Sequence, residues 1–249
     1  MEYMSVNGLE KKVSKLVFGT ATPKLFAAAR EDASKETLEE AYQLLDEVYE
    51  AGINTFDCAA HYGEEVLGNW MESRGNREKC VVITKCAHPN KWRDRVTSYD
   101  ILSDLHDSLK KLKTDKIDIY MLHRDNHKVP VSEIVDTMNQ LYEEGKITVF
   151  GGSNWTHQRI QEANLYAREH GQKEFTVSSR ILAWQSRWLI RGSVTRDLGT
   201  AASPSPARTT RRPENGTPKT RSPYLPIPVW PGDCFPALFA VQNRRRQSL

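Results

Sequence analysis

The sequence predicts an α/β fold of the (β/α)8 barrel, or TIM barrel, type, truncated after about the sixth strand and preceded by a β-hairpin. Two observations predict it. Short apolar runs alternate with stretches of helical periodicity up to residue 179. Successive runs end at Asp57, Lys85, His123 and Ser153, and the intervals of 28, 38 and 30 residues each hold one strand–helix unit. Such repeats without a reversal or a glycine-rich dinucleotide loop favour a barrel over a doubly wound sheet.

The elements can be justified in order along the chain. Asn7-Gly8 is a two-residue turn signal, which predicts a short hairpin at the amino terminus. Ser34 is a helix cap, and the apolar spacing that follows it stops before Gly52. Core strands are expected at residues 13–19, 53–57, 81–85, 117–122 and 147–152, with a sixth beginning near Phe175. The remaining helices are expected at about residues 63–74, 101–112, 131–144 and 156–170.

Composition changes sharply after residue 179. Residues 1–179 carry a net charge of −6, whereas residues 180–249 carry +9 and hold nine of the twelve prolines. No further βα unit can be recognised in the second segment. We therefore divide the chain into an incomplete barrel at 1–179 and a basic, Pro/Arg-rich tail at 180–249 that is expected to be disordered.

Several functional classes are disfavoured by residue usage. The four cysteines show neither paired nor zinc-type spacing, which favours free thiols in a reducing cytoplasm and no metal site. Residues 1–15 lack the apolar segment of a signal peptide. No stretch approaches the roughly 20 apolar residues that span a bilayer. We therefore expect a cytoplasmic protein without a membrane partner.

Four side chains at the predicted strand ends fit the reduction of a carbonyl by a hydride donor. The carbonyl oxygen needs a proton, which the Tyr62 phenol could donate if a buried Lys85 ammonium favoured the phenolate. Asp57 would hold that ammonium, and His123 would orient the carbonyl by hydrogen bonding. Taken singly, each residue is more often a cap or a packing residue. Their joint occurrence at βα spacing favours one active site.

The motifs that contain these residues resemble those of the aldo-keto reductase family. They are D-C-A-A-H-Y-G at 57–63 followed by glutamate, V-I-T-K at 82–85, L-H-R at 122–124 and G-G-S-N-W at 151–155, within about residues 10–179. The resemblance implies an NADPH-dependent reductase of small-molecule carbonyl substrates. It also implies that Tyr62 is the general acid, assisted by Asp57, Lys85 and His123.

The resemblance further implies a set of cofactor contacts. Ser153 and Asn154 would hold the nicotinamide carboxamide, and Gly19 and Thr20 correspond to a cofactor-side loop. No metal ligand is implied, and His61 is assigned to the wall of the site.

The sequence departs from the family after Ser179. The loops that hold the adenosine phosphates, after strands seven and eight, cannot be located in residues 180–249. Regrouping possible codons of the segment R-I-L-A-W-Q-S-R-W-L-I-R by one base permits P-[ND]-S-x-L-A-E-Q, which resembles the family at this point. Our hypothesis is a reading-frame shift just after Ser179, which would leave the reductase impaired or inactive.

The alternative is a non-catalytic protein whose Arg-rich tail binds nucleic acid or acidic partners. Arginine-rich low-complexity segments are more often simply solvated, and this one lacks interleaved aromatic residues. We therefore favour the reductase and expect no nucleic-acid partner.

Overall fold

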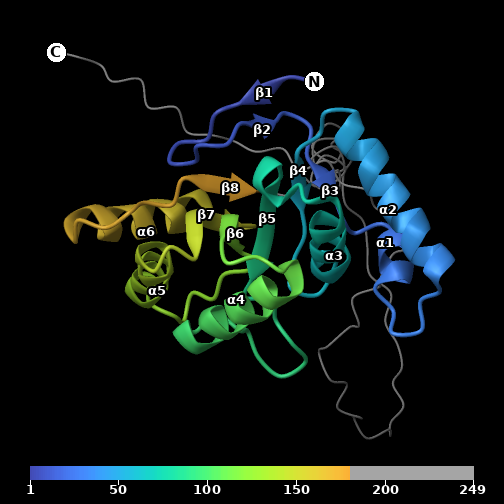
Figure 1. Ribbon diagram of the computed structural model, residues 1–249. Coiled ribbons are helices and arrows are strands. Elements are labelled where there is room, and N and C mark those ends of the chain that lie inside the picture. The colour runs from blue at the N-terminus through green and yellow to red at the C-terminus, as the bar shows by residue number, and fades with distance from the viewer. Residues whose placement is uncertain (180–249) are drawn as a thin grey trace, which may run out of the picture. The chain divides into compact units, whose positions relative to one another are not determined.

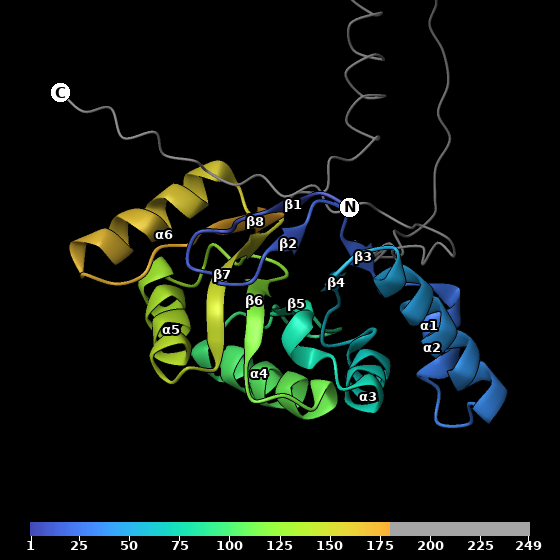
Figure 2. The same cartoon turned by 45° about the horizontal axis from the view of Figure 1, so that its top comes forward.

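A six-stranded parallel sheet forms the centre of the fold (Figure 1). The structure, a computed structural model, describes residues 1–179. The strands lie in the order in which they follow along the chain, and Figure 2 shows the sheet curling into half of a barrel. They are β3 (Phe18–Gly19), β4 (Thr55–Asp57), β5 (Val81–Cys86), β6 (Ile117–Leu122), β7 (Ile147–Ser153) and β8 (Val177–Ser179). This arrangement confirms the predicted truncated (β/α)8 fold. The predicted disordered tail lies outside the described residues.

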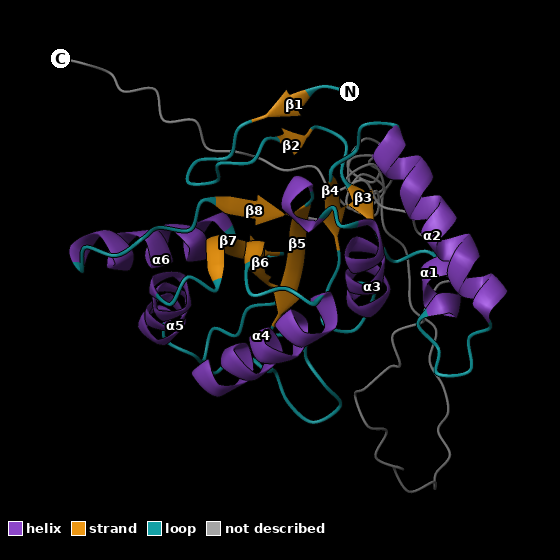
Figure 3. Cartoon of the chain, viewed as in Figure 1, coloured by secondary structure: helices purple, strands orange, loops and turns teal. Residues whose placement is uncertain are grey.

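Helices connect the strands and cover the outer face of the sheet (Figure 3). They are α2 (Lys35–Glu50), α3 (Glu64–Arg74), α4 (Ser98–Leu112), α5 (Val131–Glu143) and α6 (His157–Glu169), with a short 3-10 turn at Arg77–Lys79. The Ser34 cap is confirmed, since its side chain accepts a hydrogen bond from the Thr37 amide at 3.2 Å. None of the helices in residues 1–179 is long and apolar enough to cross a membrane.

The amino-terminal hairpin is present, but its geometry differs from the prediction. β1 (Tyr3–Met4) pairs antiparallel with β2 (Val13–Ser14). The Leu9 amide donates to the Val6 carbonyl at 3.0 Å, so the predicted turn forms at Asn7-Gly8. Only Gly8 of the two turn residues has a positive φ, +86°, which is typical of a type II turn. The turn therefore lies inside the longer connection of residues 5–12 and does not join the strands directly.

The single strand predicted over residues 13–19 is wrong, because the chain bends within it. β2 belongs to the hairpin, and β3 belongs to the main sheet. The hydroxyl of Ser14 donates to the Leu16 carbonyl at 2.7 Å, which stabilises the bend. The Ser14 amide also donates to Asn54 Oδ1 at 3.0 Å, which fastens the bend to the segment before β4.

A helix that the sequence does not predict, α1 (Pro23–Ala28), follows β3. Its six residues are too few to show a helical period. The Thr22 hydroxyl caps it by accepting from the Leu25 amide at 3.3 Å, and proline stands at the first helical position, where no backbone donor is lost.

Two apolar cores lie on the two faces of the sheet. Successive side chains along a strand point to opposite faces. Val82 on β5 packs outward beneath the helices, whereas Ile83 packs inward. The inner core is completed by residues of the hairpin and its connection, Val6 and Val13. The hairpin thus covers apolar surface that the inside of the half-barrel would otherwise expose to water.

Candidate active site at the carboxyl ends of the strands

The predicted site residues at the strand ends stand at positions whose side chains point to the inner face of the sheet. Lys85 lies two positions after the inward-facing Ile83, and His123 lies two positions after the inward-facing Met121. Parallel pairing places Asp57 opposite Ile83 on the neighbouring strand. The carboxyl ends of β3 to β7, named the carboxyl edge from here on, therefore gather these polar groups above the inner apolar core.

Lys85 is the centre of the site. Its ammonium forms an ion pair with the Asp57 carboxylate, and the side chains of the two residues are only 5% and 15% exposed. The same Nζ donates to the Cys58 carbonyl at 2.9 Å and to the Tyr62 hydroxyl at 3.4 Å. The structure thus brings three of the four predicted catalytic side chains into one contact group.

Tyr62 is positioned by a tight turn before α3. Its amide donates to the Ala59 carbonyl at 2.9 Å, and its carbonyl accepts from the Ala59 amide at 3.2 Å. Gly63 follows with φ +77°, a conformation that favours glycine. A Cβ on Gly63 would lie 2.0 Å from Thr20 Oγ1, so the turn can sit against Thr20 only because the side chain is absent.

Burial has the largest single effect on the pKa values of Tyr62 and Lys85. Burial raises the pKa of the Tyr62 phenol, and the Lys85 ammonium offsets only part of that rise. Burial by itself lowers the pKa of Lys85, but the Asp57 carboxylate together with Tyr62 and Cys58 outweighs it, so the pKa is raised overall. From the sequence we expect the Lys85 ammonium to favour the phenolate and so to lower the pKa of Tyr62. That expectation is wrong, because the loss of water around the phenol outweighs its attraction to Lys85.

His123 lies beside two further imidazoles. Its ring centroid is 5.4 Å from that of His61 and 4.8 Å from that of His88. Burial lowers the pKa of His123 to about 2, and the nearby Lys85 and Arg124 add to the effect. Burial and His88 lower the pKa of His61 to about 4. These imidazoles are therefore neutral near pH 7.

His88 is the site residue that the sequence prediction missed. It stands two positions after the end of β5, in the segment C-A-H-P. The rule that singles out polar residues at strand ends would have found it if extended past Lys85. Ala87 before it has φ +60°, and the Ala87 amide donates to Asp104 Oδ2 at 3.0 Å, which fixes the direction of the loop.

The predicted carboxamide-binding pair ends β7 beside His123. Asn154 Nδ2 donates to the His123 carbonyl at 3.3 Å and to Ser153 Oγ at 3.2 Å. The Asn154 amide donates to the Ser179 carbonyl at 2.7 Å. Asn154 adopts φ +61°, a left-handed conformation that asparagine tolerates better than most residues.

The other predicted cofactor residues lie on the opposite side of Asp57. Gly19 pairs with Asp57 in the sheet. The backbone amide and the hydroxyl of Thr20 both donate to the Asp57 carbonyl, at 2.9 and 3.1 Å. Thr20 is only 1% exposed, and the hydrogen bond from its hydroxyl helps to hold the end of β4, which carries Asp57.

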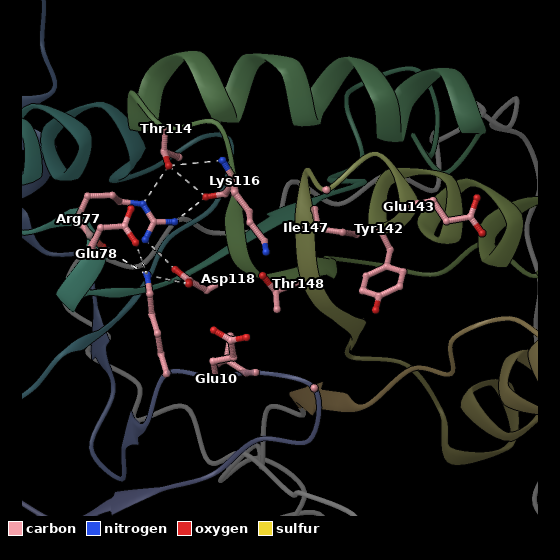
Figure 4. Close-up of a pocket in the computed structure, with 14 residues that line it drawn as sticks. Glu10, Arg77, Glu78, Thr114, Lys116, Asp118, Tyr142, Glu143, Ile147 and Thr148 are labelled. Carbon is pink, nitrogen blue, oxygen red and sulfur yellow. Dashed lines mark hydrogen bonds and ion pairs between the residues drawn. The ribbon is translucent and has the colours of Figure 1, made fainter.

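A cleft of about 620 Å³ lies at the other end of the same strands (Figure 4). Its lining includes Arg77, Asp118 and the start of β7. Arg77 Nη1 and Lys11 Nζ lie 2.8 and 3.0 Å from the two oxygens of Asp118. We name the amino-terminal ends of β5, β6 and β7 the amino edge. Lys11, Arg77 and Asp118 are paired with one another there, and the amino edge is separate from the Lys85 group.

Comparison with known proteins finds a shared family. The sequence model described as aldo/keto reductase family matches residues 15–182. A probable aryl-alcohol dehydrogenase of Saccharomyces cerevisiae is 32% identical over 166 residues, which cover 61% of this chain and 49% of the relative. The aryl-alcohol dehydrogenase [NADP(+)] of Phanerodontia chrysosporium is 33% identical, covering 56% and 40%. The norsolorinic acid reductase of Emericella nidulans is 34% identical, covering 63% and 42%. The chain thus spans about half the length of the curated relatives it matches.

Proposed function

The chain belongs to the aldo/keto reductase family, and we propose that it reduces a small-molecule carbonyl to an alcohol with NADPH as hydride donor. The family implies an oxidoreductase. The observation that carries the proposal is the contact of one buried ammonium, that of Lys85, with both the Asp57 carboxylate and the Tyr62 phenol. A buried ammonium held between a carboxylate and a phenol fits proton transfer better than it fits a structural role.

The groups beside His123 fit a nicotinamide carboxamide. Ser153 Oγ already accepts from Asn154 Nδ2, so its hydroxyl proton remains available for donation. Within residues 1–179, no donor is assigned to Asn154 Oδ1. One free donor and one free acceptor match the acceptor and donor of a carboxamide. NADPH bound there would supply the hydride, and Ser153 and Asn154 would hold its carboxamide.

Tyr62 would then deliver the proton. Its raised pKa keeps the phenol protonated at neutral pH, which is the form a general acid needs. The alkoxide produced by hydride transfer is a far stronger base than a phenolate, so proton transfer remains favourable. Lys85 would stabilise the phenolate left behind. The neutral imidazole of His123 would orient the carbonyl oxygen by hydrogen bonding.

We propose an aromatic carbonyl as the substrate class. Aryl-alcohol dehydrogenases and a norsolorinic acid reductase are among the relatives. The ring of Phe26 on α1 lies edge-on to that of Tyr62, with the ring centroids 6.4 Å apart. The centroid of the His61 ring lies 4.9 Å from that of Tyr62. Rings of this kind favour a planar aromatic group beside the phenol.

We further propose that the chain as encoded is impaired, with an incomplete barrel at 1–179 and a tail at 180–249 that arises from the frame shift. Within the described residues, β3 and β8 each have one hydrogen-bonded neighbour and so leave a sheet edge open. The family match ends at residue 182, three positions beyond Ser179. The phosphate-binding loops of the family have no recognisable counterpart in the tail.

The test compares two proteins: the chain as encoded, and a chain whose gene has its frame restored by one base just after Ser179. NADPH is titrated against each with tryptophan fluorescence as readout, and reduction of an aromatic aldehyde is followed through NADPH oxidation. We expect saturable binding and turnover in the restored chain, and weaker binding with little turnover in the encoded one. No binding and no turnover in either chain would refute the reductase, whereas equal activity would refute the impairment.

A further inference from the structure

Three imidazoles converge at the carboxyl edge from three neighbouring strands. His61 follows β4, His88 follows β5 and His123 follows β6. One ring nitrogen of each lies within 4.8 Å of the corresponding atoms of the other two. In the proposed reduction His123 orients the carbonyl, His61 contributes only a ring beside Tyr62, and His88 has no part, so the clustering of all three imidazoles calls for an explanation.

The backbone holds these three histidines in register. The His123 amide donates to the Cys86 carbonyl at 2.8 Å, which continues the pairing of β5 and β6 beyond their ends. The Ala60 amide donates to the Lys85 carbonyl at 3.3 Å, which does the same for β4 and β5. The cluster is therefore set by the sheet itself and does not depend on a chance meeting of surface side chains.

The ring nitrogens keep free lone pairs. His88 Nδ1 lies 2.9 Å from the Pro89 carbonyl, so it must carry the proton and leave Nε2 as an acceptor. A histidine that donates one ring N–H to a carbonyl is the arrangement that orients metal-bound imidazoles. His123 Nδ1 is buried and has no hydrogen-bond partner among the described residues. Within residues 1–179, His88 Nε2 and His123 Nδ1 are therefore not held by another side chain or backbone group.

We propose that His61, His88 and His123 bind a zinc ion. Neutral imidazole is a preferred zinc ligand, and three protein ligands with an open fourth position form a common type of zinc site. Zn–N bonds of about 2.0–2.1 Å in a tetrahedron require ligand nitrogens about 3.4 Å apart. The present separations are up to 4.8 Å, so the three rings must move closer together when the ion binds.

The surroundings decide what the fourth ligand should be. The charged groups that act on His123 include Lys85 and Arg124, so the site is not rich in negative charge. An anionic fourth ligand, such as hydroxide or chloride, would balance the ion. Zinc bound here would occupy the imidazole that orients the carbonyl. The metal would therefore inhibit reduction, a consequence that rests on the proposed function, whereas zinc binding itself does not.

The test measures binding without any assay of turnover. Zn²⁺ is titrated against the metal-free full chain in competition with a chromogenic chelator, with Mg²⁺ as a hard-ion control. We expect one zinc per chain and no competition by Mg²⁺. His61→Gln and His88→Gln should each weaken zinc affinity by at least about tenfold. His106→Gln, on the exposed side of α4, should leave the affinity unchanged.

Circular dichroism verifies that each variant is folded, and the absorption spectrum of the Co²⁺-substituted chain reports coordination. An intense visible band typical of tetrahedral Co²⁺, lost in folded His88→Gln, would support the site. Absence of stoichiometric zinc binding would overturn the proposal. Equal zinc affinities in folded wild type, His61→Gln and His88→Gln would also overturn it.

Discussion

The two ends of the parallel sheet both carry charged residues, but they differ in whether those residues and their polar neighbours have hydrogen-bonding groups left unpaired. At the amino edge, the Asp118 carboxylate accepts a hydrogen bond from the Val82 amide at 2.9 Å. It also accepts from Arg77 Nη1 at 2.8 Å (Figure 4) and lies 3.0 Å from Lys11 Nζ. Arg77 also donates hydrogen bonds to the Thr114 hydroxyl and to the backbone carbonyls of Cys80 and Lys116. At the carboxyl edge, the Tyr62 phenol and three imidazoles keep hydrogen-bonding capacity that no described residue uses.

The difference teaches how to separate stability from chemistry in this fold. A saturated group of charges fastens strands together and has nothing left to offer a ligand. A group with spare donors beside a buried ammonium costs stability and is retained where it binds or reacts. The amino edge is therefore expected to affect unfolding alone, and the carboxyl edge is expected to affect turnover first.

The substitution Tyr62→Phe in the frame-restored chain should have the largest effect and tests whether the carboxyl edge affects turnover without affecting stability. Loss of a general acid should lower kcat by about 10² to 10⁴-fold. The melting temperature should change little, because the ring and its contacts remain. The rate of NADPH oxidation with an aromatic aldehyde and a thermal melt provide both readouts. An unchanged kcat would remove Tyr62 from the proposed mechanism.

At the amino edge, Asp118→Ala should lower stability and should not affect turnover directly. The change leaves the buried Val82 amide without its acceptor and two cations without their partner, which should lower the free energy of unfolding by about 3 kcal/mol. Urea denaturation measures it, with Asp118→Asn as a milder control. A folded variant with a large loss of kcat but no loss of stability would contradict the division.

The two glycines that flank α3, Gly63 before it and Gly75 after it, test how tightly the carboxyl edge is packed. Gly75→Ala, with φ +59° and no atom within 4 Å of its new Cβ, should cost about 1 kcal/mol from backbone conformation. Gly63→Ala adds a clash with Thr20 and should cost more than about 2 kcal/mol. It should also lower kcat by displacing Tyr62. Equal costs in urea denaturation would show that Thr20 yields.

A pH dependence of stability is expected from His123. Its folded pKa of about 2 lies below the ordinary value of 6.5, so the unfolded chain binds a proton that the folded chain refuses. The stability contribution is complete above about pH 6.5 and is lost as the pH falls toward 2. One such group contributes at most about 1.4 kcal/mol per pH unit.

Urea denaturation from pH 7 to pH 4, with a chelator present, measures this slope. His123→Gln should reduce the slope but leave the part that comes from His61, whose pKa is lowered to about 4. His106→Gln should not change it. An unchanged slope in His123→Gln would show that the imidazole is hydrated in the folded chain.

Several features could be predicted from the sequence because they depend on local periodicity. The spacing of Asp57, Lys85 and His123 at strand ends predicts a shared edge, and the structure brings Asp57, Lys85 and Tyr62 into contact. The bend at Ser14 could not be predicted, because it depends on a hydrogen bond to Asn54, 40 residues away. α1 is too short for a periodic signal.

Residue order by itself determined the family, the parallel strand order and which side chains point inward. Those properties follow from the two-residue period of a strand and the length of a βα unit. Tertiary structure decided the protonation state of Tyr62, since burial outweighs Lys85 there. It also decided the meeting of His61 and His88 with His123. Such contacts depend on depth and on neighbouring loops, which a linear pattern does not encode.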